Sequence, residues 1–420
     1  MKKLLLMFAV VGATLFTACN KDQNCGHDFI EYDYSKNLVG TWTYLEEGQA
    51  EAMVINPDGS FTITGVMNGG LGAMYEEKGT IKVVNNKVTL AYNSGDVFEG
   101  RLELVAGKSL SIVLFEEENI RLTYNYCEND LADEVVGMWV CNDGPSAGKD
   151  MAIITYSENG KMTMTAESTS FVSKDLVNVE SDYVVVGDLI FKLLPKGNVG
   201  EGLPKYIASR LIYTPNGTSL GDILTETSYL VNNDFEVIET TSTFLRVKEG
   251  LNLTGKTYDY SSAYVSNAKG IDENFTILGQ TFNMANINGV NFDMLFRSEL
   301  FSSDLSANAL TLRFRANGRD IEIVIPITVD GNKITLDLSA ENPAYRKVDL
   351  YVFQDADDSQ LHMYMNTKAF IDYFACMELY YSLSSGRINP SDTAAIEKVF
   401  TDMEARVESI NASFVFKLRK

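Results

Sequence analysis

The residues that could carry out chemistry are few in this sequence, and their spacing forms no catalytic pattern. The chain has two histidines, His27 and His362, and neither stands in a Ser/His/Asp arrangement or a metal-ligand motif. There is no H-E-x-x-H motif of the kind that binds catalytic zinc. Residues 355–358 carry three aspartates, which could hold calcium, but they lack the glycine and distal glutamate of an EF-hand loop. We therefore predict that the protein is not an enzyme and uses no cofactor or metal.

Cysteine spacing predicts neither a zinc site nor a definite disulfide. The sequence has five cysteines, without a C-x-x-C pair or a Cys/His cluster. Disulfides form readily in exported chains. The pairing that we favour joins Cys25 to Cys127, because these two flank the first domain expected below.

The N-terminus has the pattern of an export signal. Two lysines at positions 2 and 3 precede an apolar run over residues 4–16, which is shorter than the roughly 20 residues of a membrane-spanning helix. Phe16-Thr17-Ala18-Cys19 then resembles the lipobox of bacterial lipoproteins, with Phe16 at the position where leucine is preferred. The resemblance implies a signal peptide over residues 1–18, a lipid on Cys19 that anchors the chain to the outer membrane, and a tether over residues 19–37. An ordinary secretory signal with a chance cysteine is the alternative. The sequence leaves open whether the protein faces the periplasm or the cell surface.

Length and charge limit the function classes. At roughly 100–200 residues per domain, 420 residues predict two to four domains. A formal net charge of −22 argues against nucleic-acid binding, which rewards basic patches, and against electrostatic docking on anionic lipid.

A short motif is repeated along the chain. Gly40-x-Trp42 and Gly137-x-Trp139 contain both tryptophans of the protein, and a related segment ends at Tyr258. Both tryptophans therefore stand in the same local setting, which indicates tandem copies of one kind of domain.

Sequence patterns that are typical of β-hairpins also recur along the chain. Residues 56–64 match residues 157–165, and residues 83–90 match residues 329–336. Asp-Gly and Asn-Gly flanked by alternating apolar residues are typical of β-hairpins. Each repeat also ends on an apolar strand with a basic residue. These residues are Arg121, Arg246 and Arg419.

These signals predict a mainly β chain of three tandem domains over residues 38–130, 134–249 and 252–420. Each domain has about eight short strands, which close well into an antiparallel up-and-down barrel without exposed edges. In the third domain, residues 367–382 and 392–410 have the spacing of two helices, inserted before the last strand.

The G-x-W turns and terminal arginines resemble those of the lipocalin-like (calycin) barrels that many Bacteroidales lipoproteins carry, mostly without known function. In that family the tryptophan closes one end of the barrel and the arginine stacks across it. The resemblance therefore assigns barrel-closing, structural roles to Trp42 with Arg121 and to Trp139 with Arg246. Tyr258 takes the place of tryptophan in the third domain, a departure that makes its membership less certain.

We expect a membrane-anchored envelope protein that binds a small apolar or glycan ligand without catalysis. The alternative is a structural or interaction subunit, with filled barrels, that docks another envelope protein. A cleft lined by convergent carboxylates would instead favour an enzyme such as a glycosidase. The aromatic residues of the first predicted helix could bind a glycan or lipid, or pack on the barrel. These residues are Tyr373, Phe374, Tyr380 and Tyr381.

Overall fold

The computed structural model describes residues 37–46, 49–66, 71–114, 121–141, 152–167, 176–193, 206–218, 221–231, 237–271, 274–277, 280–283, 302–316, 319–340, 342–355 and 357–420. The predicted signal peptide, Cys19, Cys25 and His27 lie outside these residues. None of the helices in the described part has both the length and the apolar character that a membrane-spanning helix requires.

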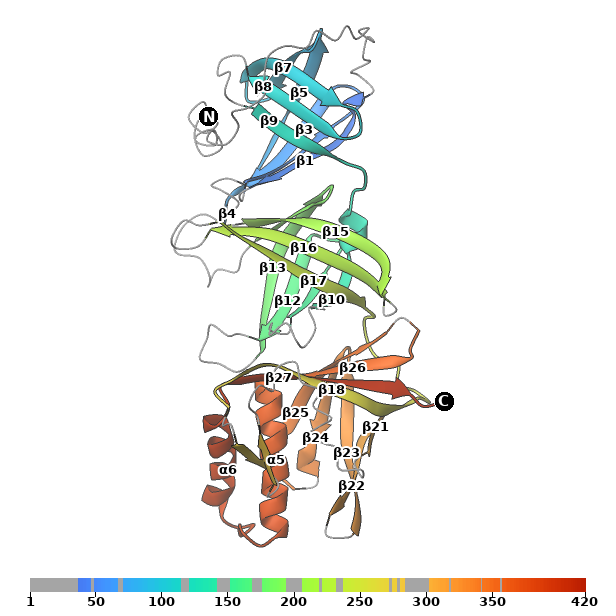
Figure 1. Ribbon diagram of the computed structural model, residues 1–420, viewed down its shortest axis with the longest axis vertical. Helices are drawn as coiled ribbons and strands as arrows, with labels where there is room; N and C mark the ends of the chain where they lie inside the picture. Colours follow the sequence, from blue (N-terminus) through green and yellow to red (C-terminus); the bar gives the residue numbers. More distant parts are fainter. Residues whose placement is uncertain are drawn as a thin grey trace. The chain divides into compact units, whose positions relative to one another are not determined.

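The first barrel is a closed antiparallel sheet, because β1 pairs with β2 on one side and with β9 on the other (Figure 1). Side chains alternate between its interior and its surface, as expected of strands with one buried face. Asn85 and Asn86, between β5 and β6, have φ angles of 49° and 60°, which suit the two-residue turn predicted there. The strands are β1 (Gly40–Glu46), β2 (Gln49–Ile55), β3 (Ser60–Val66), β5 (Met74–Val84), β6 (Lys87–Tyr92), β7 (Val97–Val105), β8 (Ser109–Leu114) and β9 (Arg121–Cys127).

The second barrel follows the short helix α3 (Ala132–Val135). Its sheet runs in the order β14-β13-β12-β11-β10-β17-β16-β15, and β14 also pairs with β15, so that the sheet closes. The two-residue strand β4 (Leu71–Gly72) adds to it by pairing with Tyr206 and Ile207 of β15. The strands are β10 (Gly137–Cys141), β11 (Ala152–Tyr156), β12 (Lys161–Glu167), β13 (Leu176–Val186), β14 (Leu189–Leu193), β15 (Tyr206–Thr218), β16 (Gly221–Val231) and β17 (Val237–Val247).

The third barrel closes where β18 pairs with β27, and the strands β19 (Asn274–Ile277) and β20 (Gln280–Asn283) form a separate hairpin. The prediction of a mainly β chain with three tandem eight-stranded antiparallel barrels is thus confirmed for the described residues. The barrel strands are β18 (Thr257–Lys269), β21 (Ser302–Ser306), β22 (Ala309–Ala316), β23 (Arg319–Asp330), β24 (Lys333–Asp337), β25 (Lys347–Gln354), β26 (Gln360–Met365) and β27 (Ser409–Leu418), with a 3₁₀ turn over Leu338–Ala340.

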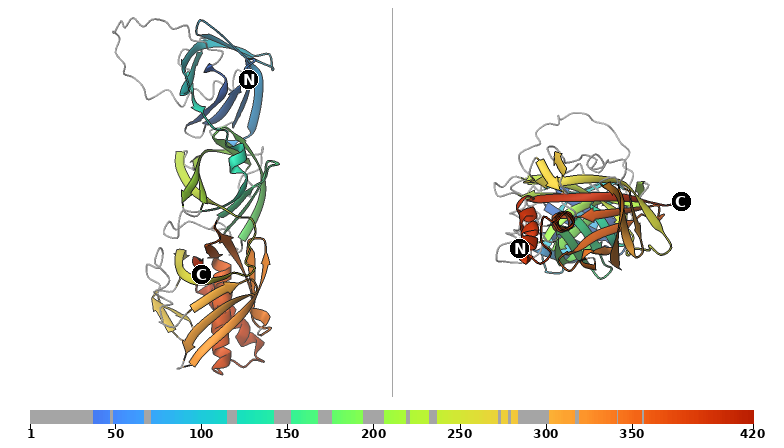
Figure 2. Two further views of the ribbon diagram at one scale, coloured as in Figure 1. Left: turned by 90° about the vertical axis from the view of Figure 1, so that its right-hand side faces the viewer. Right: turned by 90° about the horizontal axis from the view of Figure 1, so that it is seen from below.

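A helix pair, α5 (Thr367–Ser384) and α6 (Thr393–Ala405), lies between β26 and β27 in the chain and beside the third barrel (Figures 1 and 2). Asn366 and Asp392 cap the two helices by accepting hydrogen bonds from backbone N–H groups. The prediction that the second helix reaches residue 410 is wrong, because it ends at Ala405. Its apolar spacing continues past the helix, since Ile410 is fully buried as part of β27.

Contacts divide the chain into two compact units, and the second barrel contributes strands to both. The predicted domain limits, 38–130, 134–249 and 252–420, stay a prediction, because strand pairing shows only which strands share a sheet. Unit 1 comprises Met1–Glu134, Asp182–Ile212 and Thr227–Thr241, and unit 2 comprises Val135–Ser181, Tyr213–Glu226 and Ser242–Lys420.

Within unit 1, the turn between β13 and β14 contacts the first barrel. The carbonyl of Gly187 accepts a hydrogen bond from the backbone N–H of Leu131 at 3.0 Å. Cys127, beside this turn, has a free thiol that donates to the carbonyl of Asn129 at 3.0 Å. The predicted Cys25–Cys127 disulfide is therefore wrong.

Gly187→Ala is expected to destabilise unit 1 because of this contact. A Cβ at Gly187 would lie 2.8 Å from Cγ2 of Thr41 and 3.0 Å from Sγ of Cys127. The matched control is Gly107→Ala, since Gly107 has nearly the same φ, 64° against 62°, and no heavy atom within 4 Å of the added methyl. In urea denaturation, Gly187→Ala should lose about 1–3 kcal/mol more than the control. Equal losses would show that the turn does not contact the barrel.

Candidate functional site

The two tryptophans predicted to close barrels share one local structure. Trp42 and Trp139 are both fully buried. The Nε1–H group of Trp42 donates to the carbonyl of Leu38 at 2.8 Å, and that of Trp139 donates to the carbonyl of Val135 at 2.7 Å. Each indole therefore donates a hydrogen bond to the carbonyl four residues earlier, in the segment that leads into its barrel. The rings themselves are buried inside the barrel.

The glycine two residues before each tryptophan has a backbone conformation that side chains rarely adopt. Gly40 has a φ of 138° and Gly137 a φ of 130°. At Gly40 there is also no room, because a Cβ would lie 2.7 Å from Cε2 of Tyr126. These features explain why glycine recurs in the motif.

The structure brings Trp139 and Arg246 together. The guanidinium carbon of Arg246 lies 4.6 Å from the centroid of the Trp139 ring, within cation–π range. Strand register accounts for this contact, because Trp139 on β10 lies directly opposite Arg246 on β17. The same guanidinium donates to the carbonyl of Val136 at 3.1 Å and lies 3.4 Å from a carboxylate oxygen of Asp222.

Arg121 is not placed as predicted. Its side chain is exposed and donates to Glu103 at 2.6 Å. Trp42 on β1 lies opposite Tyr126 on β9, and the two rings meet edge to face with centroids 5.1 Å apart. Tyr126 thus holds the register position that Arg246 holds in the second barrel. Arg121 is five residues away, on the outward side of β9, so the assignment of a barrel-closing role to it is wrong.

Tyr258 replaces tryptophan in the third barrel and is also fully buried. Its hydroxyl donates to the carbonyl of Asp358 at 3.1 Å and accepts from Nε2 of Gln354 at 2.8 Å. The Asp358 carboxylate in turn pairs with Lys248 at 2.7 Å and Lys256 at 2.8 Å. Asp358, one of the three aspartates in residues 355–358, therefore holds the start of the third barrel through these contacts.

The first barrel contains a polar row that sequence reasoning missed. The carboxylate of Glu51 accepts hydrogen bonds from the hydroxyls of Tyr75 at 2.5 Å and Tyr124 at 2.6 Å. Register places Glu51, Gly65 and Tyr75 opposite one another on β2, β3 and β5. Gly65 has no side chain, and an added Cβ would lie 2.5 Å from the Tyr75 ring, so the glycine lets this tyrosine reach Glu51.

The row places negative charge close to the core of the barrel. Burial and the charge of Glu51 raise the pKa values of Tyr75, Tyr92 and Tyr124, which keeps these phenols protonated as donors. Burial and the same carboxylate raise the pKa of Glu77. The arrangement can hold a carboxylate inside an otherwise apolar barrel.

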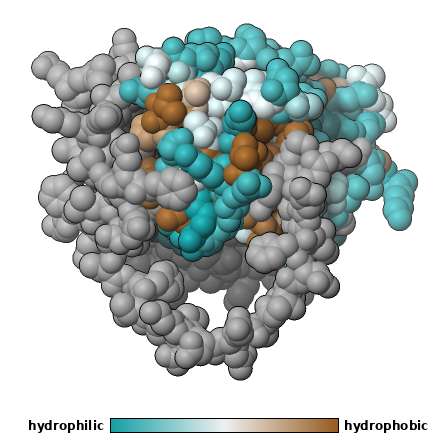
Figure 3. Space-filling view, turned by 90° about the horizontal axis from the view of Figure 1, so that it is seen from above, coloured by the Kyte–Doolittle hydropathy of each residue, from teal (hydrophilic) through white to brown (hydrophobic). Residues whose placement is uncertain are grey.

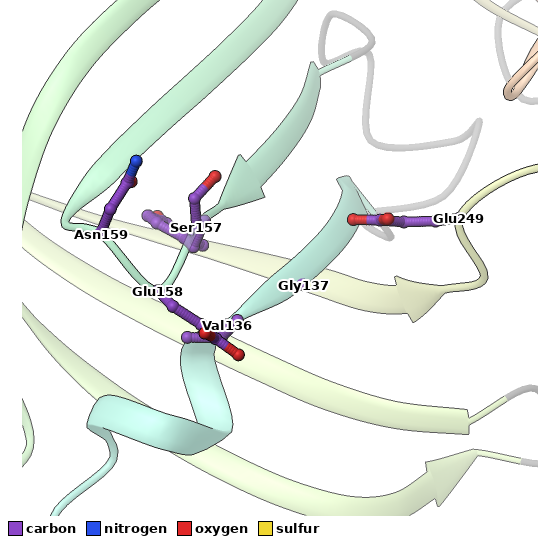
Figure 4. Close-up of a pocket in the computed structure, with 7 residues that line it drawn as sticks. Val136, Gly137, Ser157, Glu158, Asn159 and Glu249 are labelled. Carbon is purple, nitrogen blue, oxygen red and sulfur yellow. The ribbon is translucent and has the colours of Figure 1, made fainter.

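A cavity of about 430 Å³, open to solvent, lies beside the second tryptophan turn in unit 2 (Figure 4). Most of its polar side chains come from the hairpin turn between β11 and β12, and Glu249 extends towards that turn from the segment after β17 (Figure 4). It is lined by Val136, Gly137, Tyr156, Ser157, Glu158, Asn159 and Glu249.

The turn that lines the cavity is the hairpin predicted from the repeat. Gly160 has a φ of 74°, and its N–H donates to the carbonyl of Ser157 at 3.1 Å. Oδ1 of Asn159 accepts from the N–H of Lys161 at 3.1 Å. The corresponding turn of the first barrel has the same pattern, since the N–H of Gly59 donates to the carbonyl of Asn56 at 3.0 Å.

Some aromatic side chains of α5 pack against neighbouring residues, and others are exposed. The rings of Tyr373 and Phe374 contact each other with centroids 5.2 Å apart, and Phe374 is buried. The guanidinium carbon of Arg387 lies 4.8 Å from the centroid of the Tyr381 ring, and Tyr380 is exposed.

At the end of the first barrel, Figure 3 shows hydrophobic side chains as separate groups among hydrophilic ones.

Comparisons with known proteins give little further information. No protein-family model matches the chain, and no curated protein matches its sequence. A double mutant of the vaccine antigen Transferrin Binding Protein B (TbpB) from Haemophilus parasuis Hp5 is similar at 8% identity and a TM-score of 0.20, over 89% of this chain and 66% of that one. A porin-like protein from Bacteroides uniformis ATCC 8492 is similar at 10% identity and a TM-score of 0.13, over 49% of this chain and 93% of that one. At such scores neither likeness bears on function.

Proposed function

We propose that this chain is an outer-membrane lipoprotein, anchored through Cys19, that binds a glycan without catalysis. The observation that carries the proposal is the open cavity of about 430 Å³ beside the turn over residues 157–160. Its volume lies within the range of roughly 300–1,000 Å³ that is usual for ligand sites. The anchor rests on the lipobox-like N-terminus.

The chemistry of the lining favours a glycan over an apolar ligand. Ser157 offers a hydroxyl, Asn159 an amide, and Glu158 and Glu249 offer carboxylates. A sugar presents several hydroxyls, and charged acceptors form the stronger hydrogen bonds to them. An apolar ligand would offer these groups no hydrogen bonds.

The exposure of the two carboxylates supports a role in binding. Glu158 and Glu249 both lie on exposed segments of the chain. A glycosidase uses its two carboxyl groups on opposite sides of a bond, and active sites generally work where water is excluded. A carboxylate that only accepts hydrogen bonds has no such requirement.

The double variant Glu158→Gln with Glu249→Gln is expected to weaken glycan binding by about tenfold or more. Each hydrogen bond to a charged group contributes about 1.5–3 kcal/mol, and 1.4 kcal/mol corresponds to a factor of ten. Mature protein would be screened against an oligosaccharide panel, and the affinity for each bound glycan would be measured by calorimetry.

Asp330→Asn is the control, because it removes one charge from the exposed end of β23 in the third barrel. This control should bind as the unaltered protein does. Equal affinity of the double variant and the control for a glycan would show that the glycan does not bind in this cavity. A failure of the intact protein to bind any glycan saturably would contradict the function itself.

An interaction subunit of an envelope complex is the second candidate, favoured by the large side chains that are buried inside the barrels. Trp42, Phe61 and Tyr124 are buried in the first barrel, and Tyr258 and Phe416 in the third. A barrel that holds a small ligand inside must leave room for it. Native mass spectrometry of protein purified from its own envelope distinguishes the candidates. A retained small mass supports ligand binding, whereas a stoichiometric protein partner supports the subunit.

A further inference from the structure

The outer face of the third barrel carries a histidine in an apolar contact. Along β26, Leu361 and Met363 point into the barrel core, so that His362 between them points outwards. Strand register places His362 directly opposite Phe353 on β25 and Val415 on β27. Phe353 is nevertheless only 1% exposed, which shows that something covers this outer face.

The covering residues come from the outer face of β10, β11 and β17 in the same unit. Ile153, Val140 and Leu245 lie side by side on these three strands and form one buried cluster with Phe353. Tyr364 packs against the cluster and meets the Phe353 ring with centroids 5.7 Å apart. We call this set of five residues the joint cluster.

His362 borders a small cavity of about 10 Å³ at the edge of the joint cluster. Such a volume matches about one water molecule. The Nε2 atom of His362 is buried and has no hydrogen-bond partner in the protein. The other residues lining this cavity are Val140, Leu245, Arg246, Val247, Phe353, Gln354, Asp355 and Tyr364.

Among the ionisable groups that line the cavity, Asp355 favours a positive charge on His362, but burial opposes that charge more strongly. Arg246 of β17 also lines the cavity, but its guanidinium stacks on Trp139 and pairs with Asp222. Asp355, after β25, is 5% exposed and already accepts hydrogen bonds from Ser359 and Gln360. Tyr364 of β26, near Cys141 of β10, has its pKa raised to about 12 by burial, so it stays neutral.

We propose that His362 is a pH-sensitive latch of the joint cluster. As a neutral imidazole it packs beside Phe353, Val140 and Leu245, and its protonation in mildly acidic surroundings loosens β25 and β26 from β10 and β17. The cost comes from placing a charge in an apolar contact.

The direction of the pH effect follows from the two states of the histidine. Burial lowers the pKa of His362 below its ordinary value of 6.5, although Asp355 opposes the shift. Well above pH 6.5 the imidazole is neutral whether the joint is packed or loose, so pH has little effect. As the pH falls below that value, the loose state binds a proton before the packed state does, and packing weakens.

Hydrogen–deuterium exchange of the full mature protein at about pH 7.5 and about pH 5, corrected for intrinsic rates, tests the latch. Amides of β25, β26 and the end of β17 should exchange faster at the lower pH, by about tenfold for each unit by which the pKa is lowered. Amides of β6 and β7 serve as the internal reference. In His362→Phe, which fills the same space without titrating, the difference between the two pH values should vanish.

Two further variants keep the test decisive. His27→Gln removes the chain's other histidine and should retain the full pH response. His362→Gln replaces His362→Phe if the latter fails to fold, and NMR titration of His362 in the His27→Gln protein gives its pKa directly. A pKa at or above 6.5, or the same pH response with and without His362, would overturn the proposal.

Discussion

Replacing Trp42 by alanine is expected to lower the free energy of unfolding by about 3–5 kcal/mol, the usual loss on truncating a buried tryptophan. The side chain is fully buried, and it contacts the Tyr126 ring edge to face. Truncation also leaves the buried carbonyl of Leu38 without its donor, which adds to the cost of the cavity. Urea denaturation followed by circular dichroism measures the change.

Trp42→Phe is the matched control, because it keeps an aromatic ring in the barrel and removes the indole N–H. It should lose less stability than Trp42→Ala, and the difference between the two variants separates ring packing from the hydrogen bond. Trp139→Ala should show a comparable loss, since its Nε1–H makes the corresponding bond to the carbonyl of Val135. An unchanged denaturation midpoint in Trp42→Ala would refute a barrel-closing role.

The repeated barrels could be predicted from the sequence because their signals are local. The hairpin turns depend on glycine or asparagine at positive φ, and Gly59, Gly160 and Gly331 all lie where the repeat placed them. The tryptophan turns depend on a glycine two residues earlier and a carbonyl four residues earlier. Such features lie within a few neighbouring residues, so a short motif is enough to reveal them.

Contacts across strands could not be predicted in the same way. The pairing of Trp139 with Arg246 and of Trp42 with Tyr126 depends on the register between the first and last strand of a barrel. A search for a basic residue on the last strand therefore found Arg121, although it points outwards. Counting back from the end of each last strand would have led to Tyr126 and Arg246 as the equivalent residues.

The candidate sites depend still more on tertiary structure. Glu51 stands between two alanines in β2, and alternation alone does not tell whether it faces solvent or the barrel interior. Its inward position becomes clear only from Tyr75 and Tyr124, which lie 24 and 73 residues away in the chain. The open cavity likewise joins a predicted turn to Glu249, the last residue of the second predicted domain.

Replacing Cys19 by serine is expected to abolish membrane attachment if the proposed lipidation is correct. Acyl chains stabilise anchoring by about 0.8 kcal/mol per buried methylene, and serine cannot receive a thioether-linked lipid. A chain with a net charge of −22 gains nothing from an anionic membrane surface, so electrostatics cannot replace the lipid. The unaltered protein should therefore be found in the membrane fraction, with a lipid mass on its N-terminal peptide, and the variant should lose both.

The matched control for Cys19→Ser is Cys25→Ser, six residues further along the expected tether, which should leave attachment and lipid mass unchanged. The control separates a specific requirement for Cys19 from a general effect of losing a thiol near the N-terminus. A Cys19→Ser protein that stays in the membrane fraction after a high-salt wash would contradict the lipid anchor. The binding experiments on the mature body would still stand, because the cavity that they test lies in the second barrel.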